Sequence, residues 1–378
     1  MVDCLPSPAA LPQGADALTL RVAFFSDAAA GRNGTGTYYQ DLVAALEDHL
    51  SAVALFEPSA AEAGGELSLP LPGDTTQRLG LPRPSRLRAA MQWLQPHVVV
   101  AATPGPYGLL GARYARAQGG ALISGYHTDF DHLSRLYWGS LGRRVLAAPM
   151  RAAQRWLVRA SEAVVVMAPA FVPTVRSEGA RQVAVLGTPL DPLFLAPPLA
   201  APPERIERLC FIGRLAREKN LESVVEAARA WPQLSFELAG DGPLRGELEE
   251  AARECPNLRL HGWLDRPGVR ALLDASDLLL LPSHAETFGS IALEAMARGR
   301  PPLVTAAAGI HAWPELAEGL FRQGSEEPLS GALGRLQELP ANRLRAVAVE
   351  ARQAAFGLHQ RTIAEWVALL GHYAREPA

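Results

Sequence analysis

The chain has 378 residues, of which 48% are hydrophobic and 20% charged, the composition of a globular protein with two or three domains. Its net charge of −3 argues against a general nucleic-acid-binding protein, which usually carries a basic surplus. The three cysteines are scattered without C-x-x-C spacing, so we expect neither a disulfide framework nor a zinc site.

Residues 1–19 contain no basic segment followed by an apolar core, so we interpret them as a flexible leader rather than a secretory signal. No apolar run approaches the roughly 20 residues that span a bilayer. We therefore expect a cytoplasmic protein that is at most attached to a membrane surface.

From residue 20 onward, short apolar runs alternate with helical patterns. Continuous apolar runs are typical of parallel strands covered on both faces, so they predict a doubly wound α/β domain over residues 20–190. The expected strands of this domain lie at 20–25, 52–56, 98–102, 121–125, 163–167 and 183–187.

The sequence GRNGTGTYYQDL follows the first expected strand. It supplies Gly31, Gly34 and Gly36 at a strand-to-helix turn, where backbone can approach a ligand closely. The spacing is not G-x-G-x-x-G, and therefore a dinucleotide cofactor is only weakly supported.

Six prolines in residues 188–207 predict a stiff linker at 191–207, because proline continues neither a helix nor a central strand. The alternation then resumes and predicts a second Rossmann-like domain over 208–358. We expect the two domains to face each other across a cleft, with ligands at the carboxyl ends of the strands. An amphipathic pattern over 360–376 predicts a last helix that packs back onto the first domain. Strands of the second domain are expected at 208–213, 234–240, 257–262, 277–282 and 301–305.

The segment FIGRLAREKN contains the single lysine of the chain. Lysine and arginine together number 36, so the other 35 are arginines. Arg214 and Lys219 follow the expected strand that ends at Ile212, and two cations at the carboxyl end of a strand suit a diphosphate. An ordinary pair of surface charges is the alternative.

The segment HAETFGSIALEAMARG carries the strongest pattern. Residues 283–288 are expected to form a loop, and Gly289 to open a helix that runs to about Arg298. The first amide groups of such a helix favour an anion, so a diphosphate fits there. Glu294 could then bind a ribose diol, and Glu286 could bind the sugar hydroxyls. The alternative is that both are ordinary glutamates on a solvated helix.

Together these features resemble the family 4 retaining glycosyltransferases of GT-B fold. The resemblance implies that Arg214 and Lys219 hold the donor diphosphate, while Glu294 binds the ribose and Glu286 the donor sugar. Asn220 stands where the family usually has glycine. The segment AGDGPLRGELE resembles the G-x-G-P turn of the family and implies that Asp241 and Gly242 lie near the nucleotide. The remaining expected donor-binding residues are Gly34, Phe288 and Gly289.

Two further segments, TPGPYGLLGAR and SGYHTDFDHLSRLYWG, resemble a subgroup that includes sulfoquinovosyl-, mannosyl- and glucosyl-lipid synthases. This resemblance implies that His127 is the active-site histidine beside the donor sugar, although a structural histidine is the alternative. Asp129 and Asp131 form a D-x-D pattern that could hold Mg²⁺, but we favour an acceptor-side or structural role. We expect neither a metal nor a cofactor, only the nucleotide sugar as co-substrate. The expected acceptor-binding residues are Gly36, Thr37, Tyr107, Asp129 and Phe130.

Residues 132–161 contain six arginines and no acidic residue. A helix lying on an anionic leaflet has this character, at about 1 kcal/mol per basic residue. A solvated arginine face is the equal alternative. The expected membrane-surface residues are Arg143, Arg144, Arg151, Arg155 and Arg159.

These patterns predict a retaining hexosyltransferase that uses a nucleotide diphosphate sugar, with a UDP-sugar favoured. The expected acceptor is a lipid such as diacylglycerol at the inner face of the cytoplasmic membrane, and a soluble sugar or glycan is the alternative. A nucleotide-sugar 2-epimerase and a non-catalytic nucleotide-sugar binder also remain open. A phosphorylase that uses pyridoxal phosphate is disfavoured, because Lys219 is poorly placed to form its Schiff base.

Overall fold

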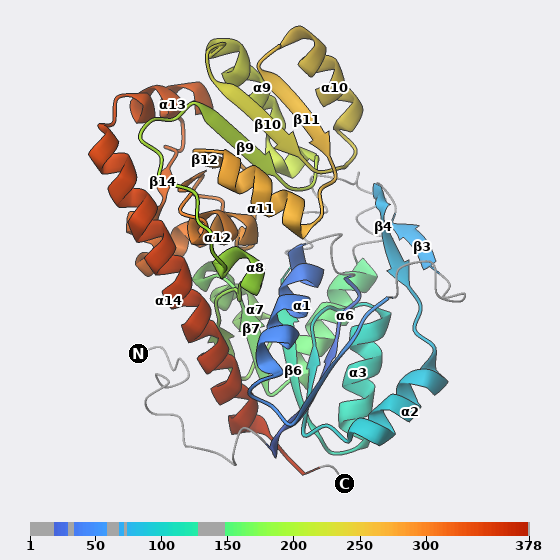
Figure 1. The fold of residues 1–378 in the computed structure, drawn as a ribbon. Helices are drawn as coiled ribbons and strands as arrows, with labels where there is room; N and C mark the ends of the chain where they lie inside the picture. Colours follow the sequence, from blue (N-terminus) through green and yellow to red (C-terminus); the bar gives the residue numbers. More distant parts are fainter. Residues whose placement is uncertain (1–18, 29–33, 59–67, 72–73, 128–147, 377–378) are drawn as a thin grey trace. The chain divides into compact units, whose positions relative to one another are not determined.

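The computed structural model describes residues 19–28, 34–58, 68–71, 74–127 and 148–376. The chain forms two compact units (Figure 1). Unit 1 contains the residues up to Pro189 and those from Gln360 onward, and unit 2 is Leu190–His359. Each unit is built on its own six-stranded parallel sheet, so the expectation of two doubly wound α/β domains is confirmed.

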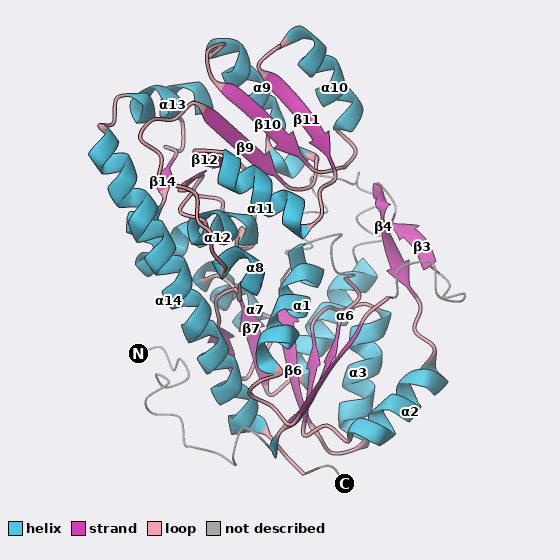
Figure 2. Cartoon of the chain, viewed as in Figure 1, coloured by secondary structure: helices cyan, strands magenta, loops and turns pink. Residues whose placement is uncertain are grey.

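The sheet of unit 1 has the strand order β2-β1-β5-β6-β7-β8, and all neighbours are parallel (Figure 2). All six strands coincide with expected apolar runs. An antiparallel hairpin, β3 (Ser68–Leu71) with β4 (Asp74–Gly80), was not expected. The strands of the sheet are β1 (Arg21–Phe25), β2 (Ala52–Phe56), β5 (Val98–Ala101), β6 (Ala121–Tyr126), β7 (Ala163–Val166) and β8 (Val183–Val185).

Helices cover both faces of this sheet because successive side chains of a strand point to opposite faces. Phe25 of β1 lies in a core shared with α2 (Pro84–Leu94), α3 (Pro106–Ala117) and α6 (Ala148–Ala160). Phe24 points the other way, and its ring lies 5.9 Å from that of Tyr39 in α1 (Gly34–Leu46). The short elements η4 (Pro169–Phe171) and α7 (Val172–Ser177) lie between β7 and β8.

The last helix, α14 (Ala341–Tyr373), is longer than the helix expected over 360–376. Its residues from Gln360 onward belong to unit 1. There Trp366 is fully buried, with its ring 6.0 Å from Phe24, and its Nε1–H donates to the hydroxyl of Tyr38 at 2.9 Å. The end of α14 and α1 therefore cover the same face of the sheet.

The sheet of unit 2 has the strand order β11-β10-β9-β12-β13-β14, again parallel throughout. Five of its strands coincide with expected runs, and the two-residue β14 was not expected. The chain thus winds in one direction from β9 to β11 and in the other from β12 to β14. The strands are β9 (Arg208–Ile212), β10 (Ser235–Ala239), β11 (Leu258–Gly262), β12 (Leu278–Leu281), β13 (Pro302–Val304) and β14 (Phe321–Arg322).

The core of unit 2 forms where alternate residues of β9 meet three helices. Leu209 and Phe211 are buried in one cluster with Val224, Leu248 and Leu333. These last three come from α9 (Leu221–Ala230), α10 (Arg245–Glu254) and α13 (Leu329–Gln337). The remaining helical elements are α8 (Pro192–Leu195), η5 (Arg217–Lys219), α11 (Arg266–Ala275), α12 (Ser290–Ala297), η6 (Gly309–Ala312) and η7 (Pro314–Gly319).

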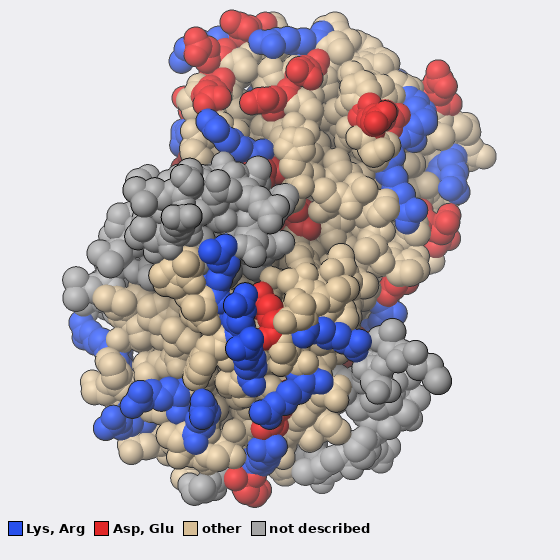
Figure 3. Space-filling model, turned by 180° about the vertical axis from the view of Figure 1, so that it is seen from behind, with Lys and Arg blue, Asp and Glu red and all other residues tan. Residues whose placement is uncertain are grey.

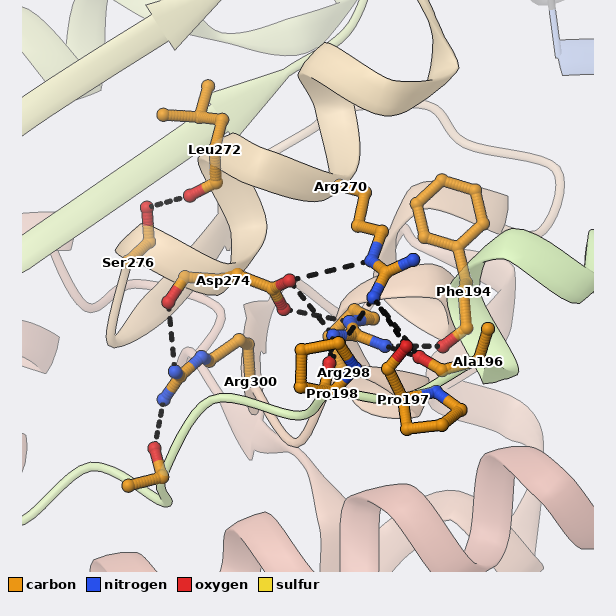
Figure 4. A network of polar contacts seen from close by, with 11 residues as sticks. Phe194, Ala196, Pro197, Pro198, Arg270, Leu272, Asp274, Ser276, Arg298 and Arg300 are labelled. Carbon is orange, nitrogen blue, oxygen red and sulfur yellow. Dashed lines mark hydrogen bonds and ion pairs between the residues drawn. The ribbon is translucent and has the colours of Figure 1, made fainter.

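The proline-rich passage expected to be a linker packs within unit 2, because its backbone carbonyls are held by buried arginine (Figure 4). The Arg298 side chain donates to the carbonyls of Phe194, Ala196 and Pro198 and forms a two-nitrogen ion pair with Asp274 at 2.7 and 2.9 Å. Prolines leave such carbonyls without a helix or strand partner, and sequence composition alone does not reveal the arginine that satisfies them.

Candidate active site

The candidate site in unit 2 lies where the winding of the sheet reverses. β9 and β12 are neighbours, and the chain leaves them in opposite directions. Loops at the carboxyl ends of two such strands diverge and leave room for a ligand between them. Arg214 and Lys219 follow β9, and the loop that carries Glu286 follows β12. The structure therefore brings the two strongest sequence patterns to one point of the sheet.

The loop after β9 turns sharply before α9 begins. Residues Arg217–Lys219 form one 3₁₀ turn, and Asn220 then has a left-handed backbone with φ of 54°. Asparagine tolerates this conformation better than most residues other than glycine, which explains how it stands where the family usually has glycine. Its side-chain amide also donates to the carbonyl of Pro282 at 3.2 Å, tying the loop after β9 to the loop after β12.

Lys219 and Glu286 form an ion pair between their Nζ and Oε2 atoms. Their side chains are 16% and 19% exposed, so the pair is largely withdrawn from water but still reachable. Arg214 is paired in the same way with Glu218, whose carboxylate is buried. Each cation at the end of β9 thus has a fixed carboxylate neighbour that restrains its position.

Backbone hydrogen bonds hold Glu286 in place. Its N–H donates to the carbonyl of Ala307 at 3.3 Å, and its own carbonyl accepts from the N–H of Gly309 at 2.9 Å. A Cβ atom on Gly309 would lie 1.9 Å from the carbonyl oxygen of Thr287, so only glycine permits this approach of the two loops. The loop after β13 therefore fixes the loop that carries Glu286.

Helix α12 begins directly after this loop. Gly289 precedes it with φ of 98°, a left-handed conformation that glycine adopts readily. The Phe288 side chain is buried and lies edge-to-face on Trp313, with ring centroids 5.9 Å apart. Any contact of Phe288 with a donor would have to come from its backbone. The first amide groups of α12 have no partners within the helix and favour an anion.

Glu294 is buried on α12 and bonded to an arginine that the sequence patterns did not single out. The Nη1 atom of Arg266 lies 2.7 Å from Glu294 Oε1, and its Nε lies 3.2 Å from Asp191. The guanidinium also lies over the ring of Phe194 at 4.7 Å. Burial raises the pKa of the Glu294 carboxyl, while Arg266 acts to lower it. The Glu294 carboxylate is therefore fixed in orientation by Arg266.

The turn after β10 brings Asp241 and Gly242 against the loop after β9. Asp241 accepts from the N–H of Gly242 at 2.8 Å, and its own carbonyl accepts from the N–H of Leu215 at 2.9 Å. A Cβ on Gly242 would lie 2.5 Å from the Leu215 carbonyl oxygen, so glycine is required for this contact. Asp241 is half exposed beside Arg245 and remains open to a ligand.

His127 of unit 1 is buried at the end of β6 among aromatic rings. Its Nε2 lies 2.7 Å from the hydroxyl of Tyr39, and its Nδ1 lies 3.0 Å from the sulfur of Met167. Because a thioether cannot donate, Nδ1 carries the proton and Nε2 accepts from Tyr39. Burial lowers the pKa of His127 to about 4, so the imidazole is neutral near pH 7. Its expected place beside the donor sugar stays a prediction.

The other expected residues of unit 1 have different environments. Gly34 begins α1, and a Cβ on it would meet nothing within 4 Å, so space beside it is open. Gly36 is buried and Thr37 half-buried on the same helix. The ring of Tyr107 is buried in the apolar core, which argues against direct contact with an acceptor. Asp129, Phe130, Arg143 and Arg144, together with the D-x-D pattern, lie outside the described residues.

Asp27, which follows β1, was missed by the sequence patterns. Its carboxylate accepts from the hydroxyl of Thr103 at 2.6 Å and from the backbone N–H of Tyr107 at 2.7 Å and Gly108 at 3.3 Å. It thus occupies the amino end of α3, the place where an anion would otherwise bind. Burial raises the pKa of this carboxyl. A Cβ on Gly105 would lie 2.4 Å from it, which explains that glycine.

Helices α3 and α6 lie side by side and present a basic surface. Neither helix contains an acidic residue. Figure 3 shows basic side chains gathered on this part of unit 1 with few acidic ones among them. Trp156, 38% exposed, lies among them with the Arg116 guanidinium 6.0 Å from its ring centre. The basic surface consists of Arg113, Arg116, Arg151, Arg155 and Arg159.

Two negative findings concern the described part of the chain. No group of three or more histidine, cysteine, aspartate or glutamate residues there is arranged to hold a metal ion. Among its helices, none combines the length and the apolar character required to cross a bilayer.

Two family models match the chain. One, described as Glycosyltransferase Family 4, matches residues 32–192, and the other, described as Glycosyl transferases group 1, matches residues 206–338. Together the two matches cover more than half of the chain: the first contains every strand of the unit 1 sheet except β1, and the second contains every strand of the unit 2 sheet. Both the Lys219–Glu286 pair and Glu294 lie within the second match.

Individual proteins of known name are also similar. Glycogen synthase of Mycobacterium tuberculosis is 32% identical over 203 residues, which are 50% of this chain and 47% of that protein. The GDP-mannose-dependent alpha-(1-6)-phosphatidylinositol dimannoside mannosyltransferase of the same organism is 31% identical over 171 residues, 44% of each. The chain spans about half the length of these curated relatives.

Anabaena Alr3699/HepE, solved in complex with UDP-glucose, has a TM-score of 0.65 to this structure at 17% identity. The superposition covers 93% of this chain and 100% of that one. At such low identity the likeness concerns the fold alone.

Proposed function

Because the chain belongs to the family 4 glycosyltransferases and has their two-domain GT-B fold, we propose that it transfers a hexose from a nucleotide diphosphate sugar to an acceptor hydroxyl with retention of configuration. The observation that carries this proposal is the convergence of Arg214, Lys219, Glu286 and the start of α12 at one edge of the unit 2 sheet. Cations, a helix start and a carboxylate are the groups that a diphosphate and a sugar require.

The reaction consists of one bond exchange at the anomeric carbon. The bond from this carbon to the diphosphate oxygen breaks, and a bond to the acceptor oxygen forms on the same face. The acceptor proton passes to the departing diphosphate, so no nucleophile of the protein and no metal is required. Lys219, Arg214 and the amide groups of α12 stabilise the negative charge that develops on the leaving group, which is electrostatic catalysis.

Glu286 and His127 position the sugar in this proposal. Glu286 is fixed through the backbone of the loop after β13, so its carboxylate is preorganised to accept hydrogen bonds from sugar hydroxyls. His127 is neutral, and its protonated Nδ1 and hydrogen-bonded Nε2 give it a defined orientation. Glu294, oriented by Arg266, accepts from the ribose diol of the nucleotide.

A UDP-sugar is the favoured donor, and the UDP-glucose complex of the Anabaena protein of the same fold supports this choice.

A membrane lipid such as diacylglycerol is the favoured acceptor. The mannosyltransferase of Mycobacterium tuberculosis that is similar to this chain is named for a lipid acceptor, phosphatidylinositol dimannoside, which supports this choice. The basic surface of α3 and α6 supports a peripheral position on the inner face of the cytoplasmic membrane.

A soluble glycan acceptor is the second candidate, and the similarity to glycogen synthase favours it. The two candidates differ in one measurable respect. A lipid acceptor requires the enzyme to work at a surface, so transfer would depend on vesicles and fall with added salt. A soluble acceptor would be used equally well without vesicles.

A mass-spectrometric transfer assay tests the proposal. Purified protein is mixed with anionic vesicles containing diacylglycerol and, in separate reactions, with UDP-glucose, UDP-glucuronate, UDP-galactose or GDP-mannose. We expect one UDP-sugar to yield a glycolipid. Nucleotide release without glycolipid would mean that water accepts the sugar, and faster release on addition of a soluble glycan would then support the second candidate. Conversion of a donor into its epimer would identify a 2-epimerase. Binding of a donor with no turnover under any condition would contradict an enzymatic role.

A further inference from the structure

The proline-rich passage brings a carboxylate, Asp191, to an arginine of the candidate donor site. Asp191 is the N-cap residue of α8, and its Oδ1 atom accepts from the N–H of Leu193 at 2.8 Å. Its Oδ2 atom accepts instead from Nε of Arg266 at 3.2 Å, across 75 positions of the chain. Asp191 therefore makes a local contact and a long-range contact, and it makes them with different oxygen atoms.

Arg266 lies between two carboxylates. Its Nε atom is bonded to Asp191, and its Nη1 atom donates to Glu294 Oε1 at 2.7 Å. The guanidinium also lies over the ring of Phe194, 4.7 Å from the ring centre. Because a guanidinium is planar, two bonded nitrogens and an aromatic ring against one face define its orientation. The proline-rich passage thus orients Arg266, and Arg266 in turn orients Glu294.

The proline-rich passage is itself held on both sides of Asp191. Before it, the N–H of Leu190 donates to Nδ1 of His359 at 3.0 Å. After it, Arg298 and Arg270 donate to carbonyls of the passage, as Figure 4 shows. Arg298 follows α12 directly, so the helix that carries Glu294 also anchors the passage that supports it. A side chain on such a fixed backbone is suited to position another group.

One oxygen of the Glu294 carboxylate remains for a ligand. Arg266 is bonded to Oε1, and no described residue is bonded to Oε2. The Glu294 side chain is 8% exposed, so the carboxylate is open to a ligand on a narrow side only. A hydrogen bond weakens steeply when its angle is poor. A ribose hydroxyl that approaches this single oxygen therefore depends on how the carboxylate is turned.

We propose that Asp191 and Arg266 are positioning residues of the donor site, which turn the Glu294 carboxylate towards the ribose diol and so make the site selective for ribonucleotides over deoxyribonucleotides. The inference rests on the proposed function, in which Glu294 binds the ribose. It makes the proline-rich passage a working part of the nucleotide site. Neither residue touches the reacting atoms, so their effect lies in nucleotide affinity rather than in the chemical step.

Titration calorimetry on the full chain tests the proposal with two probes, UDP and 2′,3′-dideoxy-UDP, which lacks both ribose hydroxyls. GDP and its dideoxy form are the second pair of probes, used if UDP does not bind. We expect the wild-type protein to bind the ribonucleotide about tenfold more tightly or better, the usual effect of one hydrogen bond to a charged group. The ratio of the two affinities is the readout, because a general loss of structure weakens both nucleotides alike.

Three variants assign the effect. Asp191→Asn removes the ion pair with Arg266 but keeps the cap of α8, because asparagine caps a helix as well as aspartate does. Arg266→Gln removes the arginine itself. In both variants the ratio should fall to about threefold or less, since the ribose then meets a carboxylate that is no longer held. Glu204→Gln is the matched control: it removes an exposed carboxylate of the same passage, paired with Arg345, and should leave the ratio unchanged.

A fourth variant, Glu294→Gln, separates this inference from the proposed function. If no nucleotide binds, if the wild-type protein does not discriminate, or if Glu294→Gln keeps the full ratio, the ribose contact fails and the inference fails with it. If Glu294→Gln abolishes the ratio but either Asp191→Asn or Arg266→Gln retains it, the ribose contact stands and the inference alone is overturned. Equal weakening of both nucleotides by Asp191→Asn also overturns it, since that result indicates a general structural effect.

Discussion

The side-chain amine of Lys219 is ion-paired with the carboxylate of Glu286 across the point where the unit 2 sheet reverses its winding. The two residues are 67 positions apart in the chain and come from the loops of neighbouring strands. Each therefore depends on the other for its position. This dependence leads to the first two predictions.

Replacing Lys219 with alanine should reduce kcat by roughly 10²–10³-fold, the usual effect of removing one group that stabilises developing charge. The fold should survive because the Lys219 side chain is not part of the apolar core of unit 2. Steady-state kinetics with the donor identified in the transfer assay measure the effect, and thermal unfolding checks the fold. Lys219→Arg should recover only part of the rate, since its planar fork needs more room. Turnover of Lys219→Ala equal to wild type would remove the diphosphate role.

The double variant Lys219→Ala/Glu286→Gln should be less impaired than the two single effects combined. Removing one partner leaves the other without its ion pair, so part of each single effect is a loss of positioning. A double-mutant cycle on kcat/KM measures this coupling. Effects that multiply without interaction would show that the pair is not maintained during turnover.

Removal of the buried Arg298 side chain should strongly lower the stability of the protein. Arg298 is fully buried, and Arg298→Ala removes five hydrogen bonds, so that three backbone carbonyls lose this donor and Asp274 keeps, among the described residues, only Arg270 at 3.6 Å. The variant should lower the free energy of unfolding by about 3–5 kcal/mol. Chemical denaturation followed by tryptophan fluorescence measures this change. Arg343→Ala, which removes an exposed ion pair with Glu318, is the control and should change stability by less than about 0.5 kcal/mol.

The buried His127 predicts a loss of stability in acid. Burial lowers its pKa from 6.5 to about 4, so the unfolded chain binds a proton that the folded protein excludes. Its contribution is complete above pH 6.5 and is lost as the pH falls towards 4, by about 2 kcal/mol near pH 5. Unfolding at a series of pH values checks this against His127→Gln, which cannot titrate. Parallel curves for the two proteins would contradict the prediction.

The basic surface of α3 and α6 predicts salt-sensitive vesicle binding. Replacing Arg151, Arg155 and Arg159 with glutamine should weaken binding to anionic vesicles by roughly 100-fold, at about 1 kcal/mol per residue. Vesicle sedimentation at two salt concentrations measures it. The same change at Arg229, Arg253 and Arg259, all exposed in unit 2, removes equal charge and should have little effect. Equal losses in both variants would indicate a general effect of charge.

Local patterns were sufficient to predict the sheets. Buried parallel strands such as β5 and β12 read as continuous apolar runs, because both of their faces are covered. The hairpin β3–β4 and the two-residue β14 were missed because their sequences lack such a run. α14 was recognised only in its last part, although Leu344, Val347, Ala351, Ala355 and Leu358 are buried at helical spacing in its earlier part.

The candidate site was predictable where it follows a local pattern and unpredictable where partners are distant. Lys219, Glu286 and Glu294 stand at fixed spacings beside strands and a helix start. Arg266, which orients Glu294 from 28 positions away, has no local signature. The burial of Tyr107 also has no local signature in the sequence. A tyrosine after a turn can face either a ligand or the core, and only the packing of the folded chain decides between them.

The single lysine has a practical consequence for chemistry on this protein. A reagent selective for primary amines meets one side chain in the whole sequence, and that side chain lies at the candidate donor site beside Glu286. Acylation of Lys219 would therefore act as a built-in reporter of occupancy, slowed by whatever nucleotide sugar fills the site. If a panel of donors is compared, the donor that slows the acylation of Lys219 most is the one that binds the site best. This comparison requires no knowledge of the acceptor.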